Sequence, residues 1–172
     1  MNFPYITTAE LRKQVNTPQT TIIDVRPVEA YNGWRLKNET RGGHIRGARS
    51  LPLKWTNYID WIEIVRSKEI LPDQYLIIYG YESGDSKLVA ERFFRSGYEN
   101  IKVYNLFLDE WSANESLPMD HLHRYQHLVS PEWLKTLLDG GTPPEFDGSD
   151  FVLCHGHYQN RGAYEEGHIP GA

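Results

Sequence analysis

The fold is decided by a short stretch that occurs twice, as Gly43-His44-Ile45-Arg46-Gly47-Ala48 and again as Gly167-His168-Ile169-Pro170-Gly171-Ala172. Each copy follows a similar helix-start pattern at nearly the same offset, Thr8-Ala9-Glu10-Leu11 in the first and Ser130-Pro131-Glu132-Trp133 in the second. Matching phrases about one domain length apart are typical of a structural repeat. We therefore expect a complete domain at residues 1–118, a linker at 119–129 and the N-terminal part of a second such domain at 130–172.

The composition fits a globular protein, with 40% hydrophobic, 13% aromatic and 24% charged residues. A net charge of -5, with lysine and arginine scattered, argues against nucleic-acid binding. No run of about 18 apolar residues is present, so we expect no membrane span. The N-terminus shows no signal-peptide pattern, and the single cysteine excludes an internal disulfide; the compartment stays open.

Residues 1–118 alternate short apolar strands with amphipathic helices, which is typical of an α/β fold with a parallel sheet covered on both faces. We expect helices at 8–15, 56–67 and 86–96, and strands at 21–25, 75–79 and 101–104. A polar insertion lies at 32–42, and the second copy predicts a helix at 130–138 and a strand at 151–153. Ligands of such sheets bind beyond the carboxyl ends of the strands, so we expect a site in loop 80–85.

Several motifs together resemble the rhodanese (thiosulfate sulfurtransferase) superfamily. They are Asp24-Val25-Arg26, both Gly-His-Ile-x-Gly-Ala phrases, Tyr164 before the second phrase, Gly97-Tyr98-Glu99-Asn100, Trp111 and Leu117-Pro118. The resemblance covers essentially the whole chain. It implies a doubly wound domain with a central parallel sheet flanked by helices, followed by the first part of another, as in the N-terminal part of a tandem sulfurtransferase.

The same resemblance implies a catalytic cysteine that opens the loop after the central strand and carries sulfane sulfur as a persulfide. Backbone N–H groups at a helix N-terminus would favour the thiolate that this chemistry needs. In this chain the corresponding loop is Gly80, Tyr81, Glu82, Ser83, Gly84, Asp85 and Ser86, and Gly80 stands at the cysteine position. We therefore expect a vestigial loop with no catalytic residue, no metal and no cofactor.

Two further departures from the family pattern agree with that loss. Asp85 stands where the family has an arginine, and with Glu82 it would repel anionic thiosulfate. Leu106-Phe107 replaces a usual Gly-Gly pair and would crowd the pocket. The module is thus expected to be structurally kept and catalytically empty.

The histidines and the cysteine allow competing interpretations. Cys154, beside His155 and His157, aligns with Asp24 of the first copy, so a strand cysteine is favoured over a nucleophile or metal ligand. His44 and His168 belong to a glycine-bounded turn, and a structural hydrogen bond is favoured over a general base. The group His121, His123 and His127 fits no zinc spacing and is interpreted as solvated linker.

Other polar and aromatic residues allow similar alternatives. Asp24 and Arg26 could bind a ligand, but a structural ion pair is favoured. Ser83 has no histidine that can be assigned as its base, which disfavours a nucleophilic serine. Tryptophans are expected in cores, except Trp34, whose place in the polar insertion suggests a plug for a neighbouring module.

The sequence leaves three hypotheses for the function of this chain. The first is a non-catalytic N-terminal module of a sulfurtransferase whose later module carries the chemistry, with downstream rhodanese modules as partners. The second is a regulatory or protein-binding domain without sulfur chemistry, and the third is an enzyme that uses Cys154. A homodimer through the tail is a further expected partnership. A Cys-x-x-Gly-x-Arg-type loop downstream would distinguish the first from the second.

Overall fold

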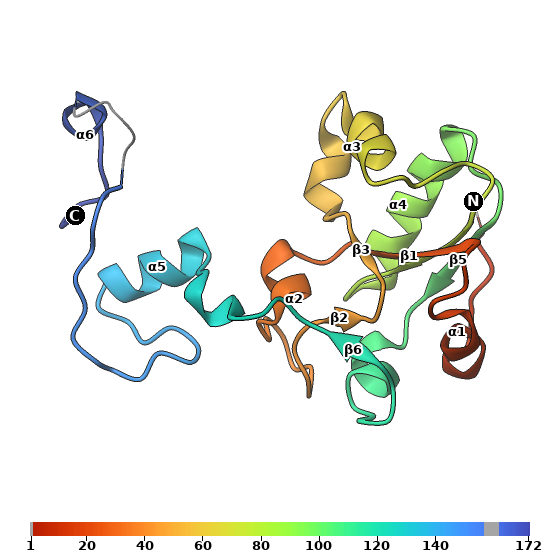
Figure 1. Ribbon diagram of the computed structural model, residues 1–172, viewed down its shortest axis with the longest axis horizontal. Helices are drawn as coiled ribbons and strands as arrows, with labels where there is room; N and C mark the ends of the chain where they lie inside the picture. Colours follow the sequence, from red (N-terminus) through yellow and green to blue (C-terminus); the bar gives the residue numbers. More distant parts are fainter. Residues whose placement is uncertain (1, 157–161) are drawn as a thin grey trace. The chain divides into compact units, whose positions relative to one another are not determined.

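The computed structural model describes residues 2–156 and 162–172 and divides the chain into two units, residues 1–129 and 130–172 (Figure 1). Residues 119–129, expected as a linker, group with the first unit. Each unit is described by itself below.

The first unit is built on a parallel sheet of four strands in the order β3-β1-β4-β5. These are β1 (Thr20–Asp24), β3 (Arg49–Ser50), β4 (Tyr75–Tyr79) and β5 (Ile101–Tyr104). The register runs from Thr20 opposite Tyr75 to Asp24 opposite Tyr79, so β1 and β4 end together. The expected α/β fold with a central parallel sheet is confirmed.

Helices cover both faces of this sheet because its strands are apolar on both sides. Ile23 and Ile78 pack on one face with α3 (Trp61–Ser67) and α4 (Ser83–Arg95). Ile22 and Ile77 pack on the other with α1 (Thr8–Gln14) and the π-helical turn η2 (Phe107–Trp111). This alternation follows the two-residue period of a strand. Figure 1 shows α3 and α4 on one side of the strands and α1 on the other.

The first residues of the helices agree with the sequence predictions in some cases and differ in others. α1 begins as predicted, because Thr7 and Glu10 form a reciprocal capping box. α4 begins at Ser83, earlier than the expected Ser86. The helix expected at 56–67 is wrong in its first part: the 3-10 helix η1 (Leu53–Asn57) is followed by Tyr58 in an extended conformation, and α3 starts at Trp61.

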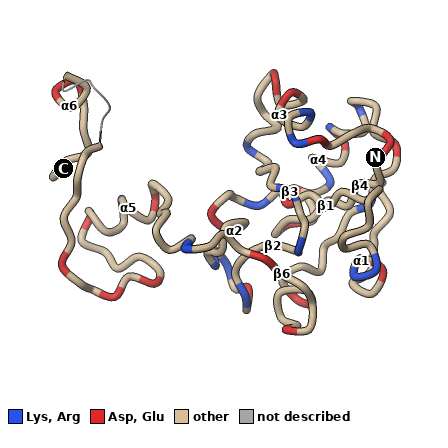
Figure 2. Tube along the Cα trace, viewed as in Figure 1, with Lys and Arg blue, Asp and Glu red and all other residues tan. Residues whose placement is uncertain are grey.

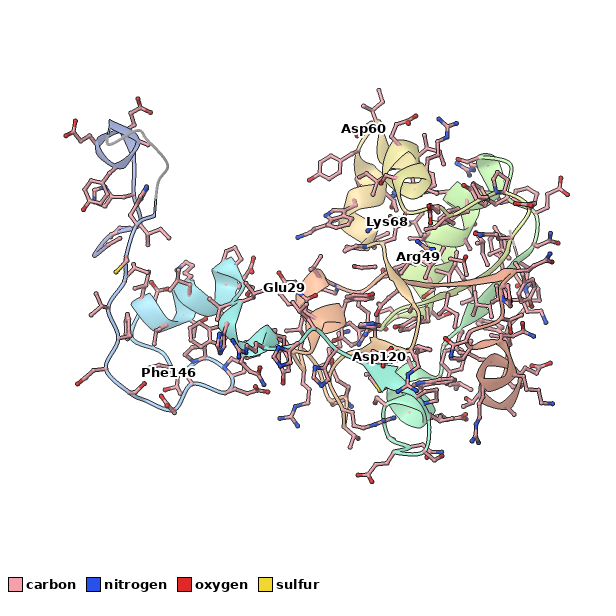
Figure 3. All side chains as sticks on the ribbon, in the orientation of Figure 1. Glu29, Arg49, Asp60, Lys68, Asp120 and Phe146 are labelled. Carbon is pink, nitrogen blue, oxygen red and sulfur yellow. The ribbon has the colours of Figure 1, made fainter. Side chains whose placement is uncertain are left out.

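The first Gly-His-Ile phrase forms a small antiparallel ladder. It contains β2 (His44–Ile45), which pairs with β6 (Met119–Asp120). Gly43 adopts φ +101°, and a Cβ there would lie 2.3 Å from the Asp120 carbonyl oxygen. Asp120, labelled in Figure 3, also accepts a hydrogen bond from Arg46 at 3.0 Å. The phrase therefore needs glycine where the two strands approach.

The segment after β6 packs on the helix that precedes the polar insertion, α2 (Val28–Asn32), which the sequence did not predict. The Leu122 N–H donates to the Asn32 carbonyl at 2.8 Å, and the short η3 (Tyr125–His127) follows. Trp34 is 6% exposed, and its Nε1 donates to the Leu128 carbonyl at 2.9 Å. The expectation that Trp34 plugs a neighbouring module is wrong, since its ring is packed inside the first unit.

The second unit begins with α5 (Pro131–Leu138), which starts as predicted because the Ser130 hydroxyl accepts from the Trp133 N–H at 3.1 Å. The later α6 (Gly162–Glu166) precedes the second phrase. Phe146, labelled in Figure 3, packs edge-to-face against Trp133 and Phe151 at centroid distances of 5.9 and 6.3 Å. This aromatic cluster joins α5 to the chain that follows it.

The strand expected at 151–153 is not formed, and Val152 is 87% exposed. A strand needs a neighbour for its N–H and C=O groups, and the described residues of this unit contain no other strand. The prediction of a strand there, and of a strand position for Cys154, is therefore wrong.

Basic and acidic segments alternate along the first unit, whereas the charged segments of the second unit are mostly acidic, with Lys135 as the single basic residue among its described residues (Figure 2). Among the described residues, no helix has the length and apolar character needed to span a bilayer.

Candidate functional site

The turn from Gly80 to Glu82 joins the carboxyl end of β4 to the start of α4. Tyr79 is the last residue of β4, and Ser83 is the first of α4. Of the residues of the vestigial loop, Ser83, Gly84, Asp85 and Ser86 thus form the first turn of the helix. The turn lies at the sheet edge where a parallel sheet places its ligands.

Gly80 is buried in a space that has no room for a side chain. An added Cβ would lie 2.8 Å from Val25 Cγ2 and 3.2 Å from Ser86 Oγ. Val25 is itself 3% exposed and β-branched, so it cannot move aside freely. Gly80 therefore carries no thiol, and the turn has no free volume for a cysteine side chain at this position.

Carboxylates surround the start of α4. Glu82 is its N-cap residue but makes no side-chain capping hydrogen bond, and Asp85 lies in the first turn. Glu82 instead accepts from Lys37 Nζ at 2.6 Å, in a pair that is largely exposed. Acidic side chains near the positive end of a helix interact favourably with its dipole.

Arg26 and Asp24 form a buried ion pair at the end of β1, as predicted. Arg26 Nη2 lies 2.6 Å from Asp24 Oδ2, and Arg26 Nε donates to Asp24 Oδ1 at 3.0 Å. Arg26 Nη2 also donates to the Gly43 carbonyl at 2.6 Å, which ties β1 to the Gly-His-Ile phrase. Burial would lower the pKa of Arg26, but Asp24 and the neighbouring tyrosines raise it, and the net shift is upward.

An aromatic box encloses the guanidinium of Arg26. Its carbon lies 4.1 Å from the Phe107 ring centroid, 5.2 Å from that of Tyr81 and 5.5 Å from that of Tyr79. The Tyr79 hydroxyl donates to Asp24 at 2.6 Å, and burial followed by the Asp24 charge raises the pKa of Tyr79 well above its usual value. Phe107 thus fills the space over Arg26 with a cation–π contact.

The polar insertion brings a second carboxylate to this box, on residues 35–42, hereafter the strap. Glu39 is 3% exposed and accepts from the N–H groups of Leu36 and Lys37 at 3.2 and 2.9 Å. The Tyr81 hydroxyl donates to the same carboxylate. Burial and this hydrogen bond to Glu39 raise the pKa of Tyr81. The strap therefore lies against the turn that follows Gly80.

Arg41 anchors the other end of the strap. Its guanidinium donates to four backbone carbonyls, those of Trp111, Ser112, Asn114 and Leu117, at distances of 2.7, 3.0, 2.6 and 3.1 Å. Sequence reasoning missed Glu39 and Arg41, because a charged residue inside a polar insertion carries no local sign of the distant segments that it will contact.

Both histidines of the repeated phrase make the same contact. His44 Nδ1 lies 2.7 Å from the Tyr31 carbonyl oxygen, and its ring stacks on Tyr31. His168 Nδ1 lies 2.8 Å from the Tyr164 carbonyl oxygen and stacks on Tyr164. The predicted structural role is confirmed for both. The partners are 13 residues apart in the first copy and 4 in the second, and the strap lies in that longer interval.

The remaining candidate residues are Ser83, Cys154 and the histidines after β6. The Ser83 hydroxyl is hydrogen-bonded to the Tyr5 hydroxyl at 3.0 Å. Cys154 is exposed in the second unit, and the ring of its neighbour His155 packs edge-to-face on Tyr164. His121, His123 and His127 are exposed, and within the described ranges no metal-binding group of side chains is present. His157 lies outside the described residues.

The parallel sheet, the Asp-x-Arg ion pair at the end of β1 and the turn at the start of α4 define the class as doubly wound α/β domains with a site at the carboxyl edge of the sheet. Residues 7–114 match the rhodanese-like domain model, and the chain belongs to that family.

The proteins similar to this chain include a thiosulfate sulfurtransferase and an ergothioneine biosynthesis enzyme. The chain is 26% identical to thiosulfate sulfurtransferase YnjE of Escherichia coli (strain K12), over 95% of this chain and 38% of YnjE. The structure of wild-type EanB superposes with a TM-score of 0.92 and 45% identity, over 99% of this chain and 40% of EanB. The same values hold for the anaerobic ergothioneine biosynthesis enzyme from Chlorobium limicola in complex with its natural substrate, trimethyl histidine. The chain thus spans about 40% of the length of these proteins.

Proposed function

We propose that this chain is a non-catalytic N-terminal rhodanese module of a sulfurtransferase, in which a later module carries the sulfane sulfur as a cysteine persulfide. The observation that carries the proposal is Gly80. It stands where the family places its cysteine, and an added Cβ there would collide with Val25 at 2.8 Å. The chain is a sulfurtransferase relative that keeps the family fold around a position without a thiol.

We further propose that the parent protein passes its sulfur to an imidazole substrate of the trimethyl histidine type. The support is the 45% identity to EanB over 99% of this chain, against 26% to the thiosulfate sulfurtransferase. Downstream rhodanese modules are the proposed partners of the first unit. They would supply the loop with the nucleophile.

A regulatory or protein-binding role is the second candidate. The observation that favours it is the apolar surface of the second unit, where Phe151, Val152 and Ile169 are 50, 87 and 45% exposed. A cavity of about 560 Å³ lies between α5 and Pro170 in the same unit. A downstream part of the same protein, or a second copy of the chain, would cover this surface.

The test uses the full-length protein that contains this chain. Thiosulfate-dependent transfer to trimethyl histidine and to cyanide is measured for the parent, for a Cys→Ser change in a later module, and for Tyr81→Phe as the matched change in this chain. The proposal expects the cysteine change to abolish transfer and Tyr81→Phe to leave kcat within about twofold. A parent without any transfer, or without a cysteine in an equivalent later loop, supports the protein-binding role instead.

A further inference from the structure

The surroundings of Glu39 have the composition of a site for a small anion. Two backbone N–H groups and one tyrosine hydroxyl donate to the carboxylate. The guanidinium of Arg26 faces it, with Arg26 Nη1 at 4.0 Å from Glu39 Oε1. Backbone N–H groups, a hydroxyl and a guanidinium are the usual ligands of bound oxyanions in proteins.

One donor in this pocket is left over. The side chain of Arg26 is fully buried, and its Nη1 atom has no hydrogen-bond partner. Its other nitrogens are used by Asp24 and by the Gly43 carbonyl. A buried N–H without a partner is unfavourable, so the pocket is shaped for a ligand that approaches Arg26 more closely than Glu39 does.

The charges around Arg26 allow one anion beside Asp24 and no more. Arg26 already balances Asp24, and Glu39 adds a second carboxylate beside the same guanidinium. A free anion entering while Glu39 stays would place three negative groups around one positive charge, which burial makes very unfavourable. Glu39 and an external anion therefore exclude each other.

The strap is held differently at its two ends. Near Glu39 the strap is held by the hydrogen bond from Tyr81 to Glu39 and by the exposed pair of Lys37 and Glu82, the second of a kind that contributes about 0–1 kcal/mol. At the other end, Arg41 holds four backbone carbonyls. The Lys37 side chain is therefore the weaker of these anchors, while the N–H group of Lys37 stays in the pocket with Glu39.

We propose that the pocket formed by Arg26, Tyr81 and the N–H groups of Leu36 and Lys37 is a binding site for a small oxyanion, and that Glu39 occupies it in cis. The Glu39 carboxylate, which belongs to the strap, is thus the ligand of this site. The proposal stands on this geometry and is independent of whether a later module performs sulfur transfer. Removal of the Glu39 carboxylate turns the closed pocket into a site for a free monoanion such as formate.

The experiment titrates sodium formate into the Glu39→Ala protein and follows urea unfolding by tryptophan fluorescence, with sodium chloride at equal ionic strength as reference. Formate should stabilise this variant saturably, and at about 100 times its Kd the unfolding equilibrium constant should fall about 100-fold. The wild type should not respond, because Glu39 fills its pocket. Glu39→Gln, which keeps the shape of the side chain, should not respond either.

Glu82→Ala is the matched control, because it removes a carboxylate of the Lys37 attachment and leaves Glu39 in place. It should show no saturable formate effect. If Glu39→Ala does not fold in chloride, its recovery is measured by refolding in formate, where folding is expected. An equal formate response in wild type or Glu39→Gln, no saturable response in Glu39→Ala, or failure of that variant to fold in formate would each overturn the proposal.

Discussion

Gly80 is the position where a single added methyl group should decide between two opposite outcomes. Its backbone is not among the positive-φ glycines, so a change to alanine at an uncrowded site would stabilise the fold by about 0.4–1 kcal/mol through the unfolded chain. The structure instead places the new Cβ 2.8 Å from Val25 Cγ2. Crowding of this kind destabilises a packed core by about 1–3 kcal/mol. We therefore predict that Gly80→Ala lowers the free energy of unfolding.

A double-mutant cycle isolates this contact. Val25→Ala alone should destabilise the protein, because it removes two buried methyl groups at roughly 1 kcal/mol each. In the double variant the new Cβ of residue 80 occupies part of the vacated space, so the loss should be smaller than the two single losses together by about 1–3 kcal/mol. Urea unfolding followed by tryptophan fluorescence gives all four free energies.

The result that refutes this reasoning is a stabilised Gly80→Ala protein, or losses that add within about 0.5 kcal/mol. Either result would mean that the turn has room for a side chain. The absence of a nucleophile would then be a simple substitution, and Gly80→Cys would be expected to restore a reactive thiol at the start of α4 without further changes.

Three other predictions concern Asp24, Arg41 and His44 and can be checked by urea unfolding. Asp24→Ala leaves Arg26 buried without its partner and should lower the free energy of unfolding by about 3–5 kcal/mol; a loss under about 1 kcal/mol would contradict the ion pair. Arg41→Met should lower it by about 2–4 kcal/mol, since four carbonyls lose a charged donor, and an unchanged midpoint would show that the strap does not need this anchor. Burial lowers the pKa of His44, so below about pH 6.5 the unfolded state takes up a proton that the native state does not, and the free energy of unfolding decreases as the pH is lowered. His44→Gln should flatten this part of the pH profile. An unchanged slope would assign the pH dependence to other groups.

The strands β1, β4 and β5, the capped helices and the Asp24–Arg26 pair were predictable because their signals are local. Thr7 and Glu10, or Ser130 and Pro131, mark a helix start within a few residues. The phrase with His44 predicts its turn because its glycines permit backbone conformations that other residues avoid.

The contents of the pocket were not predictable, because they depend on contacts between distant segments. Glu39 meets Tyr81 across 42 positions of sequence, and Arg41 meets Trp111 across 70. The strand expected at 151–153 failed for a related reason: its apolar residues predict a strand, but pairing requires a partner that the described part of the second unit does not contain.

Incubation of the chain with thiosulfate tests the central claim most directly. Intact-protein mass spectrometry reports a bound sulfur atom, and thiocyanate formation after addition of cyanide reports transfer, with Cys154→Ser as the control. The account predicts no added sulfur on residues 1–129, and thiocyanate formation at the background rate in both proteins. Turnover above background that disappears in Cys154→Ser would contradict it and would make Cys154 the nucleophile.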